Sequence, residues 1–291
     1  MRAKLTIGML IALSVAACSP SGGQAATTAT GAGITSTTSI TASTTTLPLV
    51  AGCEEGGEFF EGGGQIGSID HPGSDSTTIG TISWNADTSC ETFTISFVTS
   101  EGAPPTTPPT VSAFYVGDSP IVRLHMDVEG TVITDQLVET QFVDRLYVIR
   151  ALDGGMFIDL HLAAPAQARI ETSSSPAELI VDLQPGLLEY PVAAAASDIV
   201  VVTSPLDSAV ISGELLVEGY SRTFEANVMM IVTQGADVLA ETFTTAADWV
   251  ETWGEFRATL ALEPGDYSLF VGEESPEDGS LEGLTIDLMI Q

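Results

Sequence analysis

Apolar and polar residues alternate along much of residues 51–190, and an alternation with period two predicts β-strands. No segment of this region has a convincing 3.6-residue period, so a β-sandwich or another strand-rich domain is expected. Asp153-Gly154-Gly155 separates two alternating runs and is a strong hairpin signal. The proline-rich residues 101–110 cannot belong to a central strand. The expected strands are 91–100, 121–128, 145–152, 156–162 and 177–186.

Residues 198–291 show a cleaner pattern of seven short apolar runs, most of them separated by Gly, Pro or Asp. Seven short strands in a segment of this length are typical of an immunoglobulin-like sandwich. The region contains no cysteine, so apolar burial alone would hold its sheets together. The fold class predicted for the chain is therefore all-β, with two β-sandwich-like domains. The expected strands of this second domain are 198–205, 209–221, 224–235, 237–245, 255–262, 266–272 and 284–290.

The charge balance is strongly acidic, with 39 Asp and Glu residues against 8 Lys and Arg and a formal net charge of −31. Such a surface repels nucleic-acid phosphates and anionic lipids, so no nucleic-acid partner is expected. Two explanations of the acidity stay open, divalent-cation binding and solubility in salty surroundings. The carboxylates do not follow the spacing of a calcium-binding loop, which favours solubility.

The amino-terminal segment, residues 1–17, has the features of a signal peptide: Arg2 and Lys4 precede a short apolar core. The sequence Val-Ala-Ala-Cys that ends at Cys18 resembles the lipobox of bacterial lipoproteins. That resemblance implies cleavage before Cys18, a diacylglycerol on its thiol, and a location on the outer face of the cell membrane. The alternative is an ordinary secretory signal with an incidental cysteine.

Residues 18–50 predict a flexible tether. The segment after Cys18 contains no charged residue and consists mainly of Thr, Ser, Ala and Gly, a composition that cannot bury enough apolar surface to fold. Its root-mean-square reach would be roughly 30 Å. Tracts so rich in threonine are also candidates for O-glycosylation.

The other two cysteines, Cys53 and Cys90, form an even pair in an oxidising compartment once Cys18 is acylated. We expect a disulfide between them, which would tie the glycine-rich start of the first domain to the strand after Cys90. A reactive thiol or a metal pair is the alternative, but no CxxC motif or nearby histidine supports it.

Residues 146–183 resemble the AMIN-like domains of actinobacterial secreted proteins and lipoproteins. The resemblance lies in the hairpin that displays Asp-Leu-His-Leu, in the Ala-Arg-Ile strand at 168–170, and in the final Ser-Pro-Ala-Glu-Leu-Ile-Val-Asp-Leu strand. It implies a module that localises to the envelope or binds the cell wall and has no catalytic role.

Residues 202–232 and 273–290 resemble the Gmad-type immunoglobulin-like domain of bacterial sporulation and spore-germination proteins. Glu225 and the pair Asp278-Gly279 occupy positions that fit the family pattern. The resemblance implies a non-catalytic binding or structural module. No functional residue is carried over from it.

Two histidines lie beside aspartates on predicted strand faces. Alternation places His125 and Asp127 on one face of their strand, with Arg123, and it places Asp159 and His161 together on another. These residues are the candidates for a metal or acid–base site. The alternative, which we favour, is a solvated sheet face on which arginine and aspartate pair across strands.

Three further features each have a simple structural interpretation. His71 lies near Asp70 and Ser68, but no G-x-S-x-G motif accompanies it, so a hydrolase triad is not expected. Trp249 and Trp253 are interpreted as core or rim residues, with an exposed aromatic platform as the alternative. The carboxylates of residues 272–280 are interpreted as an acidic turn rather than a calcium site.

Together these features predict a lipid-anchored envelope protein that is not an enzyme and needs no cofactor. Its predicted ligand is a cell-wall glycan or another envelope protein. Two alternatives stay open: a metal-assisted hydrolase of cell-wall material that uses His125 and His161, and a purely structural spacer.

Overall fold

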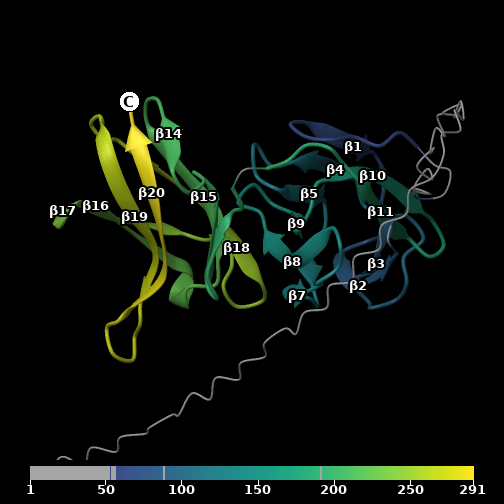
Figure 1. Ribbon diagram of the computed structural model, residues 1–291. Coiled ribbons are helices and arrows are strands. Elements are labelled where there is room, and N and C mark those ends of the chain that lie inside the picture. The colour runs from purple at the N-terminus through teal and green to yellow at the C-terminus, as the bar shows by residue number, and fades with distance from the viewer. Residues whose placement is uncertain (1–52, 54–56, 88, 191) are drawn as a thin grey trace, which may run out of the picture. The chain divides into compact units, whose positions relative to one another are not determined.

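Nearly every regular element of the protein is a β-strand (Figure 1). The computed structural model describes residues 53, 57–87, 89–190 and 192–291, and Leu49–Gln291 belong to one compact unit. Among the described residues the helical content is a single 3-10 turn, η1 (Phe224–Ala226). The described residues contain no helix that is long and apolar enough to cross a bilayer. The predicted signal segment, Cys18 and the tether lie outside the described residues.

The first β module consists of strands β1 to β11 in two packed layers. One layer is a five-stranded sheet in the order β10-β11-β3-β2-β6, and the other is the β1-β4-β5-β9-β8 part of a larger sheet, with β7 added beside β8. The strands are β1 (Gln65–Ile69), β2 (Thr78–Ala86), β3 (Glu91–Val98), β4 (Val111–Tyr115), β5 (Ile121–Met126), β6 (Gly130–Thr131), β7 (Asp135–Leu137), β8 (Val143–Arg150), β9 (Met156–Leu162), β10 (Ala166–Ser173) and β11 (Glu178–Pro185).

The second β module consists of strands β12 to β20, again in two layers. A five-stranded sheet in the order β14-β20-β19-β16-β17 faces the β18-β15-β13-β12 part of the larger sheet. The all-β fold class is thereby confirmed. The strands are β12 (Ala195–Ala196), β13 (Val200–Ser204), β14 (Ala209–Ile211), β15 (Leu215–Ser221), β16 (Asn227–Gln234), β17 (Asp237–Thr245), β18 (Trp253–Leu260), β19 (Gly265–Glu274) and β20 (Leu281–Ile290).

Each module has a hydrophobic core of its own, built by the period-two alternation of its strands. The core of the first module extends from Ile66 to Leu183, and that of the second extends from Val200 to Ile290. The face predicted for β20 is buried in the second core, where Ile286, Leu288 and Ile290 all lie. Burial of these faces against the opposite sheet supplies the main stabilisation of both sandwiches.

The observed strands depart from the predicted ones in two respects. The predicted strand 209–221 is divided into β14 and β15, because Gly213 adopts a positive φ of 97° that breaks the extended backbone. Strands β1, β2, β4, β6, β7 and β12 were not among those predicted. Some of them are too short to show an alternation, and β2 carries an irregularity between Ile79 and Ile82 that shifts its register.

A direct pairing of strands joins the two modules. β8 of the first module and β18 of the second are hydrogen-bonded in parallel, so that Trp253 lies opposite Ile149 and one ten-stranded sheet runs through both modules (Figure 1). Glycine is required at Gly254, since a Cβ there would lie 2.2 Å from the backbone nitrogen of Asp248. Strands of the two modules that are more than a hundred residues apart thus become neighbours.

Candidate ligand-binding cleft between the two modules

The polar face of β5 and β9 holds a buried ion pair instead of a solvated set of charges. Arg123 donates from Nε and Nη2 to the two carboxylate oxygens of Asp159, each at 2.8 Å, and its guanidinium stacks on the ring of Phe157 at 3.9 Å. The Asp159 side chain is 0% exposed. Burial alone would lower the pKa of Arg123, but the Asp159 carboxylate raises it. The predicted cross-strand pairing is present, and the predicted exposure to solvent is wrong.

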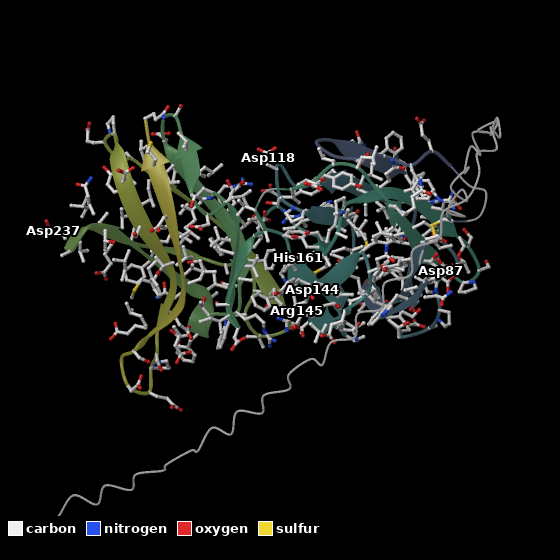
Figure 2. All side chains as sticks on the ribbon, viewed as in Figure 1. Asp87, Asp118, Asp144, Arg145, His161 and Asp237 are labelled. Atoms are coloured by element: carbon white, nitrogen blue, oxygen red, sulfur yellow. A yellow bond between two sulfur atoms is a disulfide. The ribbon has the colours of Figure 1, made fainter. Side chains whose placement is uncertain are left out.

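His161 packs into the junction between the modules (Figure 2). Its Nε2 lies 2.5 Å from the hydroxyl of Tyr220, which belongs to β15 of the second module. Burial lowers the pKa of His161 to about 4, and burial also raises the pKa of Tyr220. The protonated Tyr220 hydroxyl can therefore donate to a neutral imidazole, which makes this pair a polar contact between the two modules.

The four metal candidates are not brought together. On β5 and β9, His125 lies opposite Phe157, whereas His161 lies opposite Ile121. Four residues of strand therefore separate the two imidazoles, a spacing of roughly 13 Å that no single metal ion can bridge. Asp127 lies beyond the end of β5 and is exposed, and Asp159 is already occupied by Arg123. The four side chains therefore do not form one metal site in this structure.

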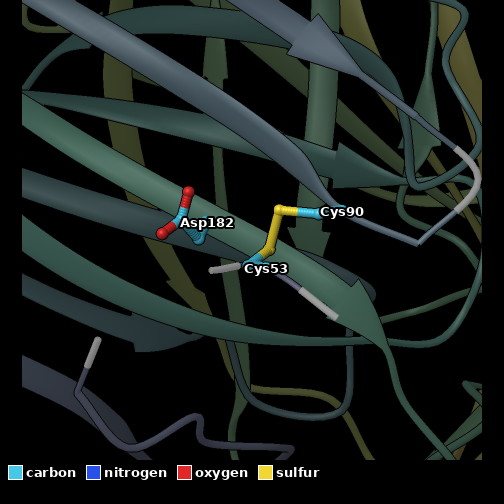
Figure 3. A group of neighbouring side chains, drawn as sticks. All are labelled: Cys53, Cys90 and Asp182. Carbon is cyan, nitrogen blue, oxygen red and sulfur yellow. A yellow bond between two sulfur atoms is a disulfide. The ribbon is translucent and has the colours of Figure 1, made fainter. Parts of the chain in front are cut away.

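One cluster of metal-ligating residue types does occur in the described part of the chain, namely Cys53, Cys90 and Asp182 (Figure 3). The two sulfurs are bonded to each other, which confirms the predicted disulfide. Asp182 accepts hydrogen bonds from Arg169 and Thr92. Because both thiols are oxidised to a disulfide and the carboxylate is hydrogen-bonded, this cluster has a structural role: it holds the start of the module against β3 and β11.

Removing the disulfide should destabilise the first module. The bond closes a loop between residues 37 apart, so the Cys53→Ala/Cys90→Ala variant should lose roughly 3–4 kcal/mol of unfolding free energy in the chain-entropy model. Urea denaturation with and without reductant measures this loss. Reductant should change the wild-type midpoint and leave the variant unaffected. A variant as stable as the oxidised wild type would contradict the prediction.

The cleft is a cavity of about 750 Å³ lined by both modules. The first module contributes the polar outer face of β4, β5 and β9 together with the β4–β5 turn, and the second contributes the outer face of β15 and β18 and the loop after β13. The lining of the first module includes Phe114, Arg123, His125 and Phe157, and that of the second includes Leu216, Glu218, Glu255 and Arg257. Neither module alone encloses this space.

Strand register determines how each wall presents its side chains. Arg123 lies opposite Phe114 on β4 and opposite Asp159 on β9, so its guanidinium is held in the middle of one wall. On the other wall, Glu218 and Arg257 are cross-strand partners of β15 and β18, and their Oε1 and Nε lie 2.7 Å apart. This second pair is much more exposed than the first. The cleft therefore has one buried and one accessible arginine–carboxylate pair.

An aromatic cluster fixes the modules on either side of the cleft. The ring of Tyr147 on β8 lies 5.0 Å from that of Trp253 and 5.2 Å from that of Tyr220, both of the second module. At the edge of the cluster Arg150 forms ion pairs with Asp248 and Glu251. A buried, mainly aromatic interface of this kind resists relative motion. The walls of the cleft should keep a constant separation.

The low pKa of His161 makes stability depend on pH. The unfolded chain binds a proton at this histidine near pH 6.5, but the folded protein does not until about pH 4. Between these values the unfolded state binds more protons, so stability falls as the pH drops through this window, by up to about 1.4 kcal/mol per pH unit. Urea unfolding at pH 6.5, 5.5 and 4.5 should show this slope in the wild type and in His71→Gln. His161→Gln should lack most of it, and an unchanged slope there would disprove the assignment.

The remaining sequence candidates occupy structural positions. Trp253 is buried in the aromatic cluster, whereas Trp249 is about one-third exposed and packs against Phe224 with ring centroids 5.4 Å apart. His71 bonds to Thr172 rather than to a serine or an aspartate. Asp278 in the acidic loop between β19 and β20 accepts hydrogen bonds from Ser280, as a turn-forming aspartate does.

Sequence reasoning did not identify the cleft residues of the second module. Leu216, Glu218 and Arg257 appear in the sequence as ordinary outer-face positions of strands. A usable signal was the scarcity of cations: outside Arg2 and Lys4, every basic residue of the chain is an arginine, and most form ion pairs within the fold. The position of Arg257 in the middle of a predicted strand could have suggested a carboxylate partner on a neighbouring strand, which is Glu218.

Comparison with known proteins relates the second module to a known family of domains. No curated protein and no solved structure matches the chain. The AMIN-like resemblance of the first module stays a prediction. Residues 199–280, from just before β13 to the end of the acidic loop, match the family model for the immunoglobulin-like domain of bacterial spore germination, and the second module is therefore an immunoglobulin-like domain similar to that family.

Proposed function

We propose that this protein is a non-catalytic binding protein of the cell envelope, held at the membrane by a lipid on Cys18, with a cell-wall glycan or another envelope protein as its ligand. The observation that carries the proposal is the cleft, whose walls come from both modules. A space of this kind, closed by a fixed interface, is the usual setting for ligand recognition.

Three observations support a binding role over catalysis. The second module matches an immunoglobulin-like family, and by fold-level analogy this suggests a non-catalytic module. In the described part of the chain, the buried polar groups beside the cleft satisfy one another, as Arg123 does with Asp159. The His125 and His161 pair, on which a metal-assisted hydrolase would depend, is split by the strand register.

Retention on purified wall material tests the binding role. The fragment 49–291, which is one compact unit, would be incubated with purified peptidoglycan and, separately, with envelope extract at low and high salt. Retention on either at both salt concentrations supports the proposal. Retention on neither would favour the structural-spacer alternative.

Lipid attachment needs a separate test in the native host. The full chain and its Cys18→Ala variant would be compared by labelling with an alkyne fatty acid and by membrane fractionation. Label and membrane association should both be lost in the variant. A labelled variant, or a wild type without label, would contradict the anchor.

A further inference from the structure

We infer that the cleft binds a hydroxyl-rich ligand that carries no negative charge and has the size of a short oligosaccharide, held between the Arg123 wall on one side and the Glu218–Arg257 wall on the other. This inference rests on the proposed binding function and narrows it from any envelope ligand to a saccharide.

The size of the cleft suits a ligand of a few rings. Its volume of about 750 Å³ lies in the upper half of the range of roughly 300–1,000 Å³ that is usual for small-molecule sites. Both modules line it, so a ligand that fills the space contacts Phe114 on one wall and Leu216 on the other. A ligand that contacts both walls requires that the interface hold the two modules at a constant separation.

The polar groups of both walls offer donors and acceptors together. Arg123 uses Nε and Nη2 on Asp159, and Arg257 uses Nε on Glu218, so each guanidinium already has its counter-charge. The ring nitrogens of His125 have no hydrogen-bond partner among the described residues. A hydroxyl group can accept from an arginine and donate to a carboxylate or an imidazole at once, which neither a pure anion nor a pure cation can do.

The net charge of the lining excludes anionic ligands. Five carboxylate side chains line the cleft against two arginines, and both arginines are already paired. An anionic ligand would therefore meet repulsion without a free cation to offset it. The five carboxylates belong to Asp118, Asp153, Glu214, Glu218 and Glu255.

Apolar side chains supply the remaining contact surface. Leu216 is 40% exposed and lines the cleft from β15, and Ile211 and Phe114 add further apolar area. Sugar rings present C–H faces that pack against such surfaces while their hydroxyls bond to flanking polar groups. The combination of apolar faces with paired arginine and carboxylate groups matches an amphipathic sugar ring without negative charge better than a simple ion.

Three tetrasaccharides of different charge test the ligand class. Fragment 49–291 would be titrated calorimetrically with tetra-N-acetylchitotetraose, which is neutral, with its deacetylated cationic form, and with tetragalacturonate, which is anionic. The neutral probe should bind, and the anionic probe should bind at least about 10-fold more weakly. Because carboxylates outnumber arginines in the lining, the cationic probe should bind at least as tightly as the neutral one. No binding of the neutral probe, or binding of the anionic probe as tight as that of the neutral one, would overturn the inference.

A matched pair of variants tests the location. Leu216→Trp fills the cleft and should weaken the neutral probe at least about 10-fold, whereas Leu239→Trp makes the same change at a leucine of similar exposure on β17, outside the cleft, and should stay within about twofold. Thermal unfolding confirms that both variants are folded. The Glu218→Gln/Arg257→Gln variant should weaken binding by about 3- to 10-fold without filling space. Wild-type affinity in both cleft variants would overturn the inference.

The outcomes separate this inference from the proposed function. If Leu216→Trp leaves retention on peptidoglycan unchanged and the tetrasaccharide does not bind, the wall-binding proposal stands and the cleft assignment fails. If the tetrasaccharide binds in the cleft but intact peptidoglycan is not retained, the ligand class stands and the wall proposal fails.

Discussion

Replacing Asp159 by asparagine is expected to lower the free energy of unfolding by about 3–5 kcal/mol, because the Arg123 charge would then be buried without a partner. Asp159 is fully buried, and it accepts both of the hydrogen bonds that hold the Arg123 guanidinium over Phe157. Urea denaturation at pH 7 measures the loss. The expected effect is among the largest that a single substitution in this protein should produce.

A double variant distinguishes loss of the partner from loss of the ion pair itself. Arg123→Met/Asp159→Leu removes both charges and should be much closer to the wild type than Asp159→Asn is, because a buried ion pair adds little net stability over an apolar pair. The exposed pair offers the matched control: Glu218→Gln should cost no more than about 1 kcal/mol. Equal losses for Asp159→Asn and Glu218→Gln would refute the argument.

Replacing Trp253 by alanine is expected to cost about 3–5 kcal/mol and to uncouple the two modules. The indole is 3% exposed, packs against Tyr147 and Tyr220, and donates from Nε1 to Asp135 at 3.3 Å. It belongs to the junction cluster and to neither module core, so both cores remain when it is removed. Calorimetry should show one unfolding transition in the wild type and two in the variant.

Trp249 provides the control for this experiment. It lies four residues earlier in the same segment, is 36% exposed, and packs only edge-on against Phe224 among the aromatic contacts of the described residues. Trp249→Ala should therefore cost about 1 kcal/mol or less and keep a single transition. A similar loss in both variants, or a single transition in Trp253→Ala, would show that the junction does not couple the modules.

The faces of the strands could be predicted because they depend on local sequence, and the disulfide could be predicted because two cysteines remain to pair once Cys18 is set aside. Alternation assigns Arg123 and His125 to one face of β5 whatever packs on that face, and the count of cysteines leaves Cys53 and Cys90 as partners. The hairpin at Gly154 and Gly155 follows from their positive φ values of 96° and 74°, which glycine adopts readily. The second module was also recognisable from its strand count and motifs, and the family match confirms it.

The surroundings of those faces could not be predicted. A period-two pattern says which residues share a face, but it carries no information on what covers that face, because the covering element is distant in sequence. The joining of the two modules leaves Asp159 fully buried and places His161 against Tyr220 of β15, whereas the sequence alone placed both in solvent. Burial also lowers the pKa of His161, and the register of β5 and β9 keeps its imidazole apart from that of His125.

By itself, then, the sequence determined an acidic, all-β protein with a lipobox-like start, two strand-rich regions and one disulfide, because composition, alternation and cysteine count can be read without knowing which elements pack together. Only the tertiary structure decided that the two regions share one sheet and that their polar faces meet. The cleft between Arg123 and Arg257 exists because strand pairing brings residues 134 positions apart onto facing walls, a long-range contact that no local pattern encodes.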